Sequence, residues 1–194
     1  MARLILGLGN PGEEYRDTRH NVGFRVVEEL ARRRRLAADR LECNSLVGRT
    51  GSGEGEVLLV RPQTYMNRSG HAARCLVERY ELDPAAVLVV YDEVNLPLGR
   101  LRLRRSGSPA GHRGLESILE SLRTDEVPRL RLGVSPGEGR PEGGEDLVEF
   151  VLSPFLPDEQ EEAEAMIRRA ADAAEAWLQE GIETAMARFN SFNG

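Results

Sequence analysis

The stretch Ala86-Val87-Leu88-Val89-Val90-Tyr91-Asp92 decides the fold class of this chain. A continuous apolar run of strand length is typical of a central strand covered on both faces, as happens when helices pack on a parallel sheet. Asp92 is expected at the carboxyl end of this strand, the edge at which α/β sheets commonly bind ligands. The run therefore predicts an α/β protein with a candidate site beside Asp92.

The sequence on either side of this run alternates between strand and helix patterns. A buried strand is expected at residues 4–8, closed by the turn Gly9-Asn10-Pro11-Gly12. Further strands are expected at 45–49, 56–61, 100–104, 130–134 and 147–152, and helices at about 20–31, 72–80, 112–122 and 158–179. Asn67 or Ser69 is placed to cap the second helix, and 136–144 could form a mobile lid.

These elements predict a single domain over residues 1–194. The expected fold is a three-layer αβα arrangement with a central mixed, mostly parallel twisted sheet flanked by helices. The chain shows no repeat, low-complexity tract or second hydrophobic nucleus, so no domain boundary is predicted.

Charge is unevenly distributed along the chain. The net charge of −6 argues against a sequence-wide affinity for nucleic acid or for an anionic membrane. Residues 95–115 nevertheless contain Arg100, Arg102, Arg104, Arg105 and Arg113, and strand alternation puts those at 100, 102 and 104 on one face. Every basic residue is Arg, which suits bidentate phosphate contacts and could equally reflect genome composition.

The cysteines and the apolar segments indicate the compartment. Cys43 and Cys75 occur in unlike contexts, so neither a disulfide framework nor a zinc ribbon is expected, and a reduced cytosol fits. The apolar stretch at 4–6 is too short for a signal peptide, and no span approaches membrane length. We expect a soluble, unprocessed, cytoplasmic protein.

Of the histidines, His20 has the context most suited to chemistry. It is expected at a helix start, where the positive end of the helix dipole favours a neutral imidazole that can accept a proton. Asp92 could hold that imidazole in one tautomer and stabilise the imidazolium. A capping role for His20 and a turn role for Asp92 remain the structural alternatives. His71 has no acidic neighbour in sequence and is expected at the surface.

The segment Gly7-Leu8-Gly9-Asn10-Pro11-Gly12 matches the G-x-G-x-x-G pattern of dinucleotide sites. In that pattern the glycines open a helix directly, whereas here Pro11 intervenes and the helical pattern begins only near His20. We interpret the match as false. Because no G-x-S-x-G, H-E-x-x-H or Cys/His cluster occurs, neither a covalent nucleophile nor a metal site is indicated. Direct attack by water is the simpler hypothesis.

Short motifs spread along the chain point, as a set, to one family. They are Leu6-Gly7-Leu8-Gly9-Asn10-Pro11-Gly12 with Tyr15, Thr18-Arg19-His20-Asn21-Val22-Gly23, Pro62-Gln63-Thr64-Tyr65-Met66-Asn67-Arg68-Ser69-Gly70, Tyr91-Asp92-Glu93 with Leu96-Pro97 and Gly99, Gly111-His112 with Gly114-Leu115, and Arg129-Leu130-Arg131-Leu132-Gly133. In order and spacing this set resembles the bacterial-type peptidyl-tRNA hydrolases through essentially the whole chain.

The resemblance implies a role for each matching position. His20 matches the catalytic base and Asp92 its hydrogen-bonded partner. Substrate binding is implied for the residues that match the family's cleft, namely Asn10, Tyr15, Met66 and Asn67. Contact with tRNA phosphate is implied for Arg102, Arg104 and Arg131. The resemblance also implies a monomeric enzyme that needs no cofactor and no metal.

Arg113 departs from the family pattern. The family usually reads Gly-Gly-His-Asn-Gly-Leu where this chain has Ala110-Gly111-His112-Arg113-Gly114-Leu115. The departure puts water placement and catalytic rate in doubt, but an Arg could still hold phosphate or an oxyanion, since a charge-assisted donor is stronger than an amide. We therefore include Arg113 among the expected substrate-binding residues.

The activity implied is hydrolysis of the ester between the peptide C-terminus and the tRNA 3′ ribose by water activated at His20, which recycles tRNA from prematurely released peptidyl-tRNA. Two alternatives stay open. One is a catalytically weak or inactive RNA-binding homologue, suggested by Arg113, and the other is a dinucleotide-binding oxidoreductase.

Overall fold

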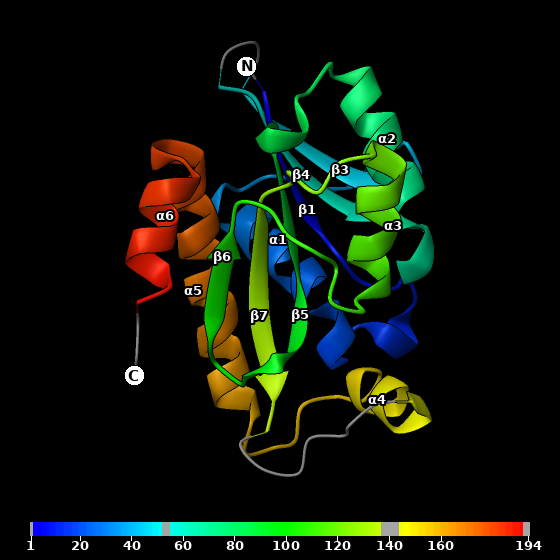
Figure 1. Cartoon of the computed structure of the whole chain (residues 1–194), viewed down its shortest axis with the longest axis vertical. Helices are drawn as coiled ribbons and strands as arrows, with labels where there is room; N and C mark the ends of the chain where they lie inside the picture. The colour runs from blue at the N-terminus through cyan, green and yellow to red at the C-terminus, as the bar shows by residue number, and fades with distance from the viewer. Residues whose placement is uncertain (1, 52–54, 137–143, 192–194) are drawn as a thin grey trace.

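A mixed sheet forms the centre of the computed structural model, which describes residues 2–51, 55–136 and 144–191 (Figure 1). Within those residues the strand order is β2-β3-β4-β1-β5-β7-β6. The strands are β1 (Arg3–Gly7), β2 (Arg40–Glu42), β3 (Ser45–Thr50), β4 (Val57–Pro62), β5 (Val87–Pro97), β6 (Leu101–Arg104) and β7 (Arg129–Ser135). Because β3 and β6 run against their neighbours while β4, β1, β5 and β7 are mutually parallel, the sheet is mixed and mostly parallel, as predicted.

Helices cover both faces of the sheet, which gives the three layers expected (Figure 1). The helices are α1 (Val22–Arg33), α2 (Ser69–Arg79), α3 (Arg113–Leu122), α4 (Gly144–Val151), α5 (Gln160–Glu180) and α6 (Ile182–Phe189), with short 3₁₀ turns η1 (Glu13–Tyr15), η2 (Arg19–Asn21), η3 (Met66–Arg68) and η4 (Pro84–Ala86). Helices α1 and α5 pack on one face and α2 and α3 on the other. No helix in the described ranges has the length and apolar character needed to cross a membrane.

Strand alternation divides the core into two halves. In β5, Leu88 and Val90 belong to the cluster with α1 and α5, whereas Val87, Val89 and Tyr91 belong to the cluster with α2 and α3. All five side chains are at most 2% exposed. The apolar run that predicted the fold is therefore continuous because both of its faces are covered.

Two glycines let α1 approach the sheet closely. A Cβ on Gly23 would lie 2.3 Å from the Val90 carbonyl oxygen and 2.5 Å from the Leu8 nitrogen, and one on Gly7 would lie 2.1 Å from the Gly23 carbonyl oxygen. A Cβ on Gly9 would meet the Phe24 ring. Packing thus accounts for the first two glycines of the dinucleotide-like pattern, and η1 and η2, not a helix, follow it.

Several predicted elements differ from the observed ones. Residues 147–152, predicted as a strand, lie in or next to helix α4. Their apolar positions Leu147, Val148, Val151 and Leu152 line a cleft at helical spacing, and a short apolar run does not distinguish the two structures. Strand β2 and helix α6 were not predicted, and the lid expected at 136–144 falls largely outside the described residues.

Two local predictions about ends of elements were also wrong. Strand β5 continues to Pro97, so Asp92 lies within the strand and not at its end. Neither Asn67 nor Ser69 caps α2, because the N-cap is Arg68 and the Ser69 hydroxyl donates instead to the Met66 carbonyl oxygen. Both errors follow from element boundaries, which sequence patterns locate poorly.

The two cysteines form a disulfide, contrary to our expectation. Cys43 lies in the turn between β2 and β3, Cys75 lies in α2, and the two are 32 residues apart in sequence. The same turn holds the chain that leads to η3, because the Gln63 N–H donates to the Asn44 carbonyl oxygen at 2.7 Å. Sequence separation and context could not show that the fold brings the two Cα atoms to 5.7 Å.

Substituting Gly23 with Ala should displace α1. The added Cβ would overlap main-chain atoms of β5 and of the residue after β1, which cannot move aside as a side chain can. Overpacking of this kind costs about 1–3 kcal/mol, so urea unfolding should show the free energy of unfolding lowered by that amount. Arg32→Ala, an exposed change in the same helix, serves as the control. Equal stability of the two variants would show that α1 is not held this closely.

Removing the disulfide should destabilise the fold. A cross-link that closes a loop of this length stabilises the folded state by about 3–4 kcal/mol through the entropy of the unfolded chain. Urea unfolding of a Cys43→Ser, Cys75→Ser double variant should show that loss against the oxidised parent. Adding a reductant should lower the parent to the level of the variant and leave the variant unchanged. A parent insensitive to reductant would contradict the cross-link.

Candidate active site

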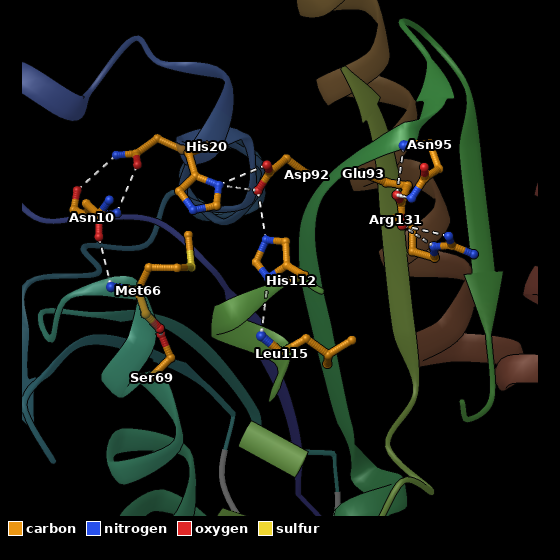
Figure 2. Close-up of polar contacts among 11 residues, drawn as sticks. Asn10, His20, Met66, Ser69, Asp92, Glu93, Asn95, His112, Leu115 and Arg131 are labelled. Atoms are coloured by element: carbon orange, nitrogen blue, oxygen red, sulfur yellow. Dashed lines mark hydrogen bonds and ion pairs between the residues drawn. The ribbon is translucent and has the colours of Figure 1, made fainter. Parts of the chain in front are cut away.

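A buried carboxylate holds the imidazole of His20 (Figure 2). Nδ1 of His20 lies 2.8 and 2.9 Å from the two carboxylate oxygens of Asp92. The Asp92 side chain is 1% exposed and that of His20 15%. Since an ionised carboxylate only accepts hydrogen bonds, Nδ1 of His20 carries the proton and donates. Nε2 of His20 is then the nitrogen with a free lone pair.

A second imidazole shares the same carboxylate. Nε2 of His112 lies 3.0 Å from Oδ1 of Asp92, and Nδ1 of His112 accepts the Leu115 N–H at 3.2 Å. This backbone donor fixes the tautomer, so Nε2 of His112 carries the proton and donates to Asp92. His112 is also the N-cap of α3, which ties the carboxylate to the start of that helix.

Burial and charge act in opposite directions on this pair. Burial disfavours the imidazolium, but the charge of Asp92 and its hydrogen bond raise the pKa of His20 above the ordinary value of 6.5. Burial also disfavours the charged form of Asp92 and raises its pKa. The two histidines lower that pKa by a larger amount, so it lies well below the usual range. The shifts of the two partners agree in direction. The expected helix dipole effect on His20 is therefore outweighed by Asp92.

Asparagine side chains fix the chain around this pair (Figure 2). The side chain of Asn21 bonds both backbone groups of Asn10, accepting from N–H at 2.9 Å and donating to the carbonyl oxygen at 3.0 Å. Oδ1 of Asn10 in turn accepts the Met66 N–H at 2.8 Å. Because Oδ1 is occupied in this way, Nδ2 of Asn10 is the end of the amide left to donate to a ligand.

Asn10, His20 and Met66 line one wall of an open cleft of about 1070 Å³. The polar residues that line it include Asn10, His20, Asn67, Asp92 and His112. The other lining residues come from 65–66, 93–94, 110–111, 113 and helix α4 with Leu152. Asn67 is exposed in η3, and its side chain makes no hydrogen bond with another described residue. The arrangement places one imidazole nitrogen and two amides in the same cleft.

Helix α4 forms the opposite wall and is fastened beside His20 by Arg19. The backbone N–H of Arg19 donates to the Ser153 carbonyl oxygen at 3.0 Å, and its buried guanidinium bonds the Ser153 hydroxyl at 2.9 Å and Glu159 at 2.5 Å. The guanidinium also stacks over the rings of Phe150 and Phe155 at 4.4 and 5.1 Å. The residue that precedes His20 thus sets the position of the cleft wall.

A metal would compete for the atoms that already make these hydrogen bonds. The ligand atoms of His20, Asp92 and His112 all lie within 4.8 Å of one another, and no other described group of three such side chains does so. A metal bound there would have to displace the protons on Nδ1 of His20 and Nε2 of His112. The geometry is that of a hydrogen-bonded triad.

Comparison with known proteins places this geometry in a family. The family model described as peptidyl-tRNA hydrolase matches residues 4–194. The chain belongs to the peptidyl-tRNA hydrolase family. It is 52% identical to a peptidyl-tRNA hydrolase of Synechococcus sp. (strain JA-3-3Ab) over 97% of this chain and 82% of that protein. It is 48% identical to one of Aquifex aeolicus over 87% of this chain and 85% of that protein.

Solved structures of the family have the same fold. The crystal structure of the peptidyl-tRNA hydrolase from Acinetobacter baumannii superposes with a TM-score of 0.89 at 33% identity. The match covers 98% of this chain and 95% of that one. The sheet and helices described above are therefore those of the family.

The fold brings most of the predicted site residues of this family member together. Asn10, His20, Met66, Asn67, Asp92 and Arg113 all line the cleft. Tyr15 does not line it. This residue ends η1, and its carbonyl oxygen accepts the backbone N–H and the hydroxyl of Thr18. His71 is exposed on α2, as predicted.

The predicted tRNA-binding arginines lie on β6 and β7, outside the cleft. Arg102 and Arg131 are opposite each other across these strands. Nε and Nη2 of Arg131 donate to the buried Glu93 carboxylate at 2.9 and 2.6 Å, so its charge is largely balanced. Arg104 is exposed. The three positions thus differ in availability to a ligand.

Sequence reasoning missed the contribution of three residues. His112 was recognised only as part of a motif, although a His at the predicted start of a helix after Gly111 is the same signal that identified His20. Asn21 and Arg19 flank His20, and their contacts with Asn10 and with Ser153 are long-range. Nothing in the sequence alone indicates those partners.

Removing the Asp92 carboxylate should lower the pKa of His20. In the Asp92→Asn variant burial still opposes the imidazolium, while the charge and hydrogen bond that raise the pKa are lost. NMR titration of the His20 ring should show a midpoint above about 6.5 in the parent and a lower one in the variant. Asp39→Asn, which removes an exposed carboxylate, should leave the midpoint in place. An unchanged midpoint in Asp92→Asn would refute this account of the pair.

Proposed function

We propose that this chain hydrolyses the ester that joins a peptide to the 3′ ribose of tRNA, and so recycles tRNA from prematurely released peptidyl-tRNA. Membership of the peptidyl-tRNA hydrolase family supports the reaction. The observation that carries the mechanism is the His20 imidazole, held at Nδ1 by a buried carboxylate in the cleft, with its Nε2 lone pair left free. That nitrogen is our candidate general base.

In the proposed reaction, water is the only reactant besides the ester, and side chains of this chain supply the catalytic groups. Nε2 of His20 takes a proton from a water molecule as the water oxygen attacks the ester carbonyl carbon. The resulting oxyanion collapses, the bond from carbon to the 3′ oxygen breaks, and the imidazolium returns its proton to that oxygen. Asp92 stabilises the imidazolium between the two proton transfers, which is consistent with the raised pKa of His20.

Amide groups would supply the positive ends of dipoles at the scissile ester. We assign Nδ2 of Asn10 to the oxyanion or to the adjacent peptide carbonyl, because its Oδ1 is already held by Met66. Asn67 and the Met66 side chain would bind the substrate in the same cleft. Binding of the peptide carbonyl would explain discrimination against an unblocked aminoacyl-tRNA, because that molecule lacks this carbonyl.

Phosphate contacts would come from the arginines of β6. We assign Arg102 and Arg104 to the tRNA backbone, since side chains two residues apart on a strand stand about 6.7 Å from each other. Arg131 belongs to the same proposal with a smaller expected contribution, because Glu93 already binds its guanidinium. For Tyr15, which does not line the cleft, substrate contact is proposed only from its match to the family motif. We further propose a monomeric enzyme without a cofactor. A cytoplasmic location is proposed from the family alone, because the paired cysteines no longer support it.

Substitution of the base tests the proposal. His20→Ala should lower kcat/KM for an N-acetyl-aminoacyl-tRNA by about 10²–10⁴, the usual contribution of a general base, with tRNA binding retained. His71→Ala, on the exposed face of α2, is the matched control and should keep the parental rate.

The outcome also separates the alternative functions. A parent protein that binds the tRNA but does not cleave the ester would identify an RNA-binding homologue. Cleavage that survives in His20→Ala would leave ester hydrolysis in place and remove His20 as its base.

A further inference from the structure

Arg113 stands out in the cleft as a cation whose guanidinium has no ion-pair partner among the described residues. Asp92 is bonded to two histidines and Glu93 to Arg131. Arg113 lines the cleft and is exposed, and its guanidinium makes no ion pair or hydrogen bond with another described residue. It is the one arginine among the residues that line the cleft within the described ranges.

The position of Arg113 is unfavourable for a purely structural cation. It is the first residue of α3, directly after the N-cap His112. The N-terminus of a helix carries partial positive charge, so an acid stabilises it and a cation there is destabilising. An anionic ligand would reverse this balance, because it would be attracted by both the guanidinium and the end of the helix.

Neighbouring acids restrict where an anion can bind. Glu145 and Glu149, both on α4, also line the cleft and would repel a phosphate from that wall. The α3 side, where Arg113 follows the histidine bonded to Asp92, is the favourable side. Close to the ester, the constant anion of the proposed substrate is the phosphate on the 5′ side of the 3′-terminal nucleoside, whereas the charge of the peptide varies.

We propose that Arg113 binds the phosphate of the 3′-terminal nucleotide of the substrate and so determines recognition of the nucleotide end of the ester. This inference rests on the proposed function. It assigns Arg113 to the substrate phosphate that lies nearest the ester. Arg113 acts by binding and takes no part in proton transfer. Its planar guanidinium can hold two phosphate oxygens at once, which a Lys cannot do.

Kinetics on an N-acetyl-aminoacyl-tRNA test the assignment. Arg113→Gln should raise KM roughly tenfold at low salt, as expected for one charge-assisted hydrogen bond, with kcat within about twofold. The slope of log kcat/KM against log salt concentration should become shallower by roughly 0.7–0.9, the change for one phosphate contact. Arg113→Lys should keep the salt slope and give an intermediate KM, because it retains the charge but not the fork.

The controls separate a ligand contact from a general effect of charge. Arg123→Gln removes an arginine from the far end of the same helix and should leave KM and the salt slope unchanged. The thermal midpoint of Arg113→Gln should equal or exceed that of the parent, since a cation leaves the start of the helix. A fall in kcat at constant KM would make Arg113 an oxyanion donor and overturn the proposal, as would an unchanged salt slope.

A binding measurement keeps this test independent of catalysis. Adenosine 5′-monophosphate should bind the parent more tightly than adenosine does, and Arg113→Gln should bind the two equally, as followed by NMR titration. Equal binding of the two by the parent would refute the phosphate contact. A parent that prefers the monophosphate but cleaves no ester would instead refute the proposed function and leave the assignment of Arg113 standing.

Discussion

The close approach of α1 to the sheet is the constraint on which the site depends. Gly7 and Gly23 allow main chain to lie against main chain, with no room for a Cβ on either residue. Because η2 leads directly into α1, this contact fixes where His20 lies relative to β5 and brings its imidazole to Asp92. Gly7, which belongs to the dinucleotide-like pattern, is therefore needed for the position of the His20–Asp92 pair and not for a cofactor.

Asp92 is shared by two imidazoles that come from opposite faces of the sheet. His20 precedes a helix packed on one face and His112 begins a helix packed on the other, so the carboxylate links the two layers. Burial raises the pKa of Asp92, but its charge interactions with His20 and His112, together with the two hydrogen bonds, lower it by more and keep the carboxylate ionised. A negative charge kept buried in this way raises the pKa of His20 and orients the ring with Nε2 free. Layer packing and proton chemistry thus depend on the same group.

The sequence predictions succeeded for features set by neighbouring residues and failed for contacts between residues far apart in the sequence. The run at Val87–Tyr91 indicates its own environment, since its side chains are apolar and all are buried. The resemblance to the peptidyl-tRNA hydrolases predicted one cleft for Asn10, His20, Asn67 and Asp92, and all four line the same cleft. Residues 147–152 were misassigned because a short apolar run fits both a strand and one face of a helix. The disulfide and the contacts of Arg19 join segments that are distant in sequence, and local pattern contains no information about them.

The arginines of this chain have two different roles, structural where protein groups bond the guanidinium and ligand-binding where it faces the cleft. All basic residues of the chain are Arg, and the buried Arg129 uses its full guanidinium: it donates from three nitrogens to the carbonyl oxygens of Val127, Gly107 and Asp125. A Lys, with a single ammonium group, could not hold three separate carbonyls in that plane. Arginines satisfied in this way stabilise loops, whereas Arg113 is left facing the cleft at the start of a helix. Net charge therefore says little about the partner, because only the cations without protein partners remain to bind an anion.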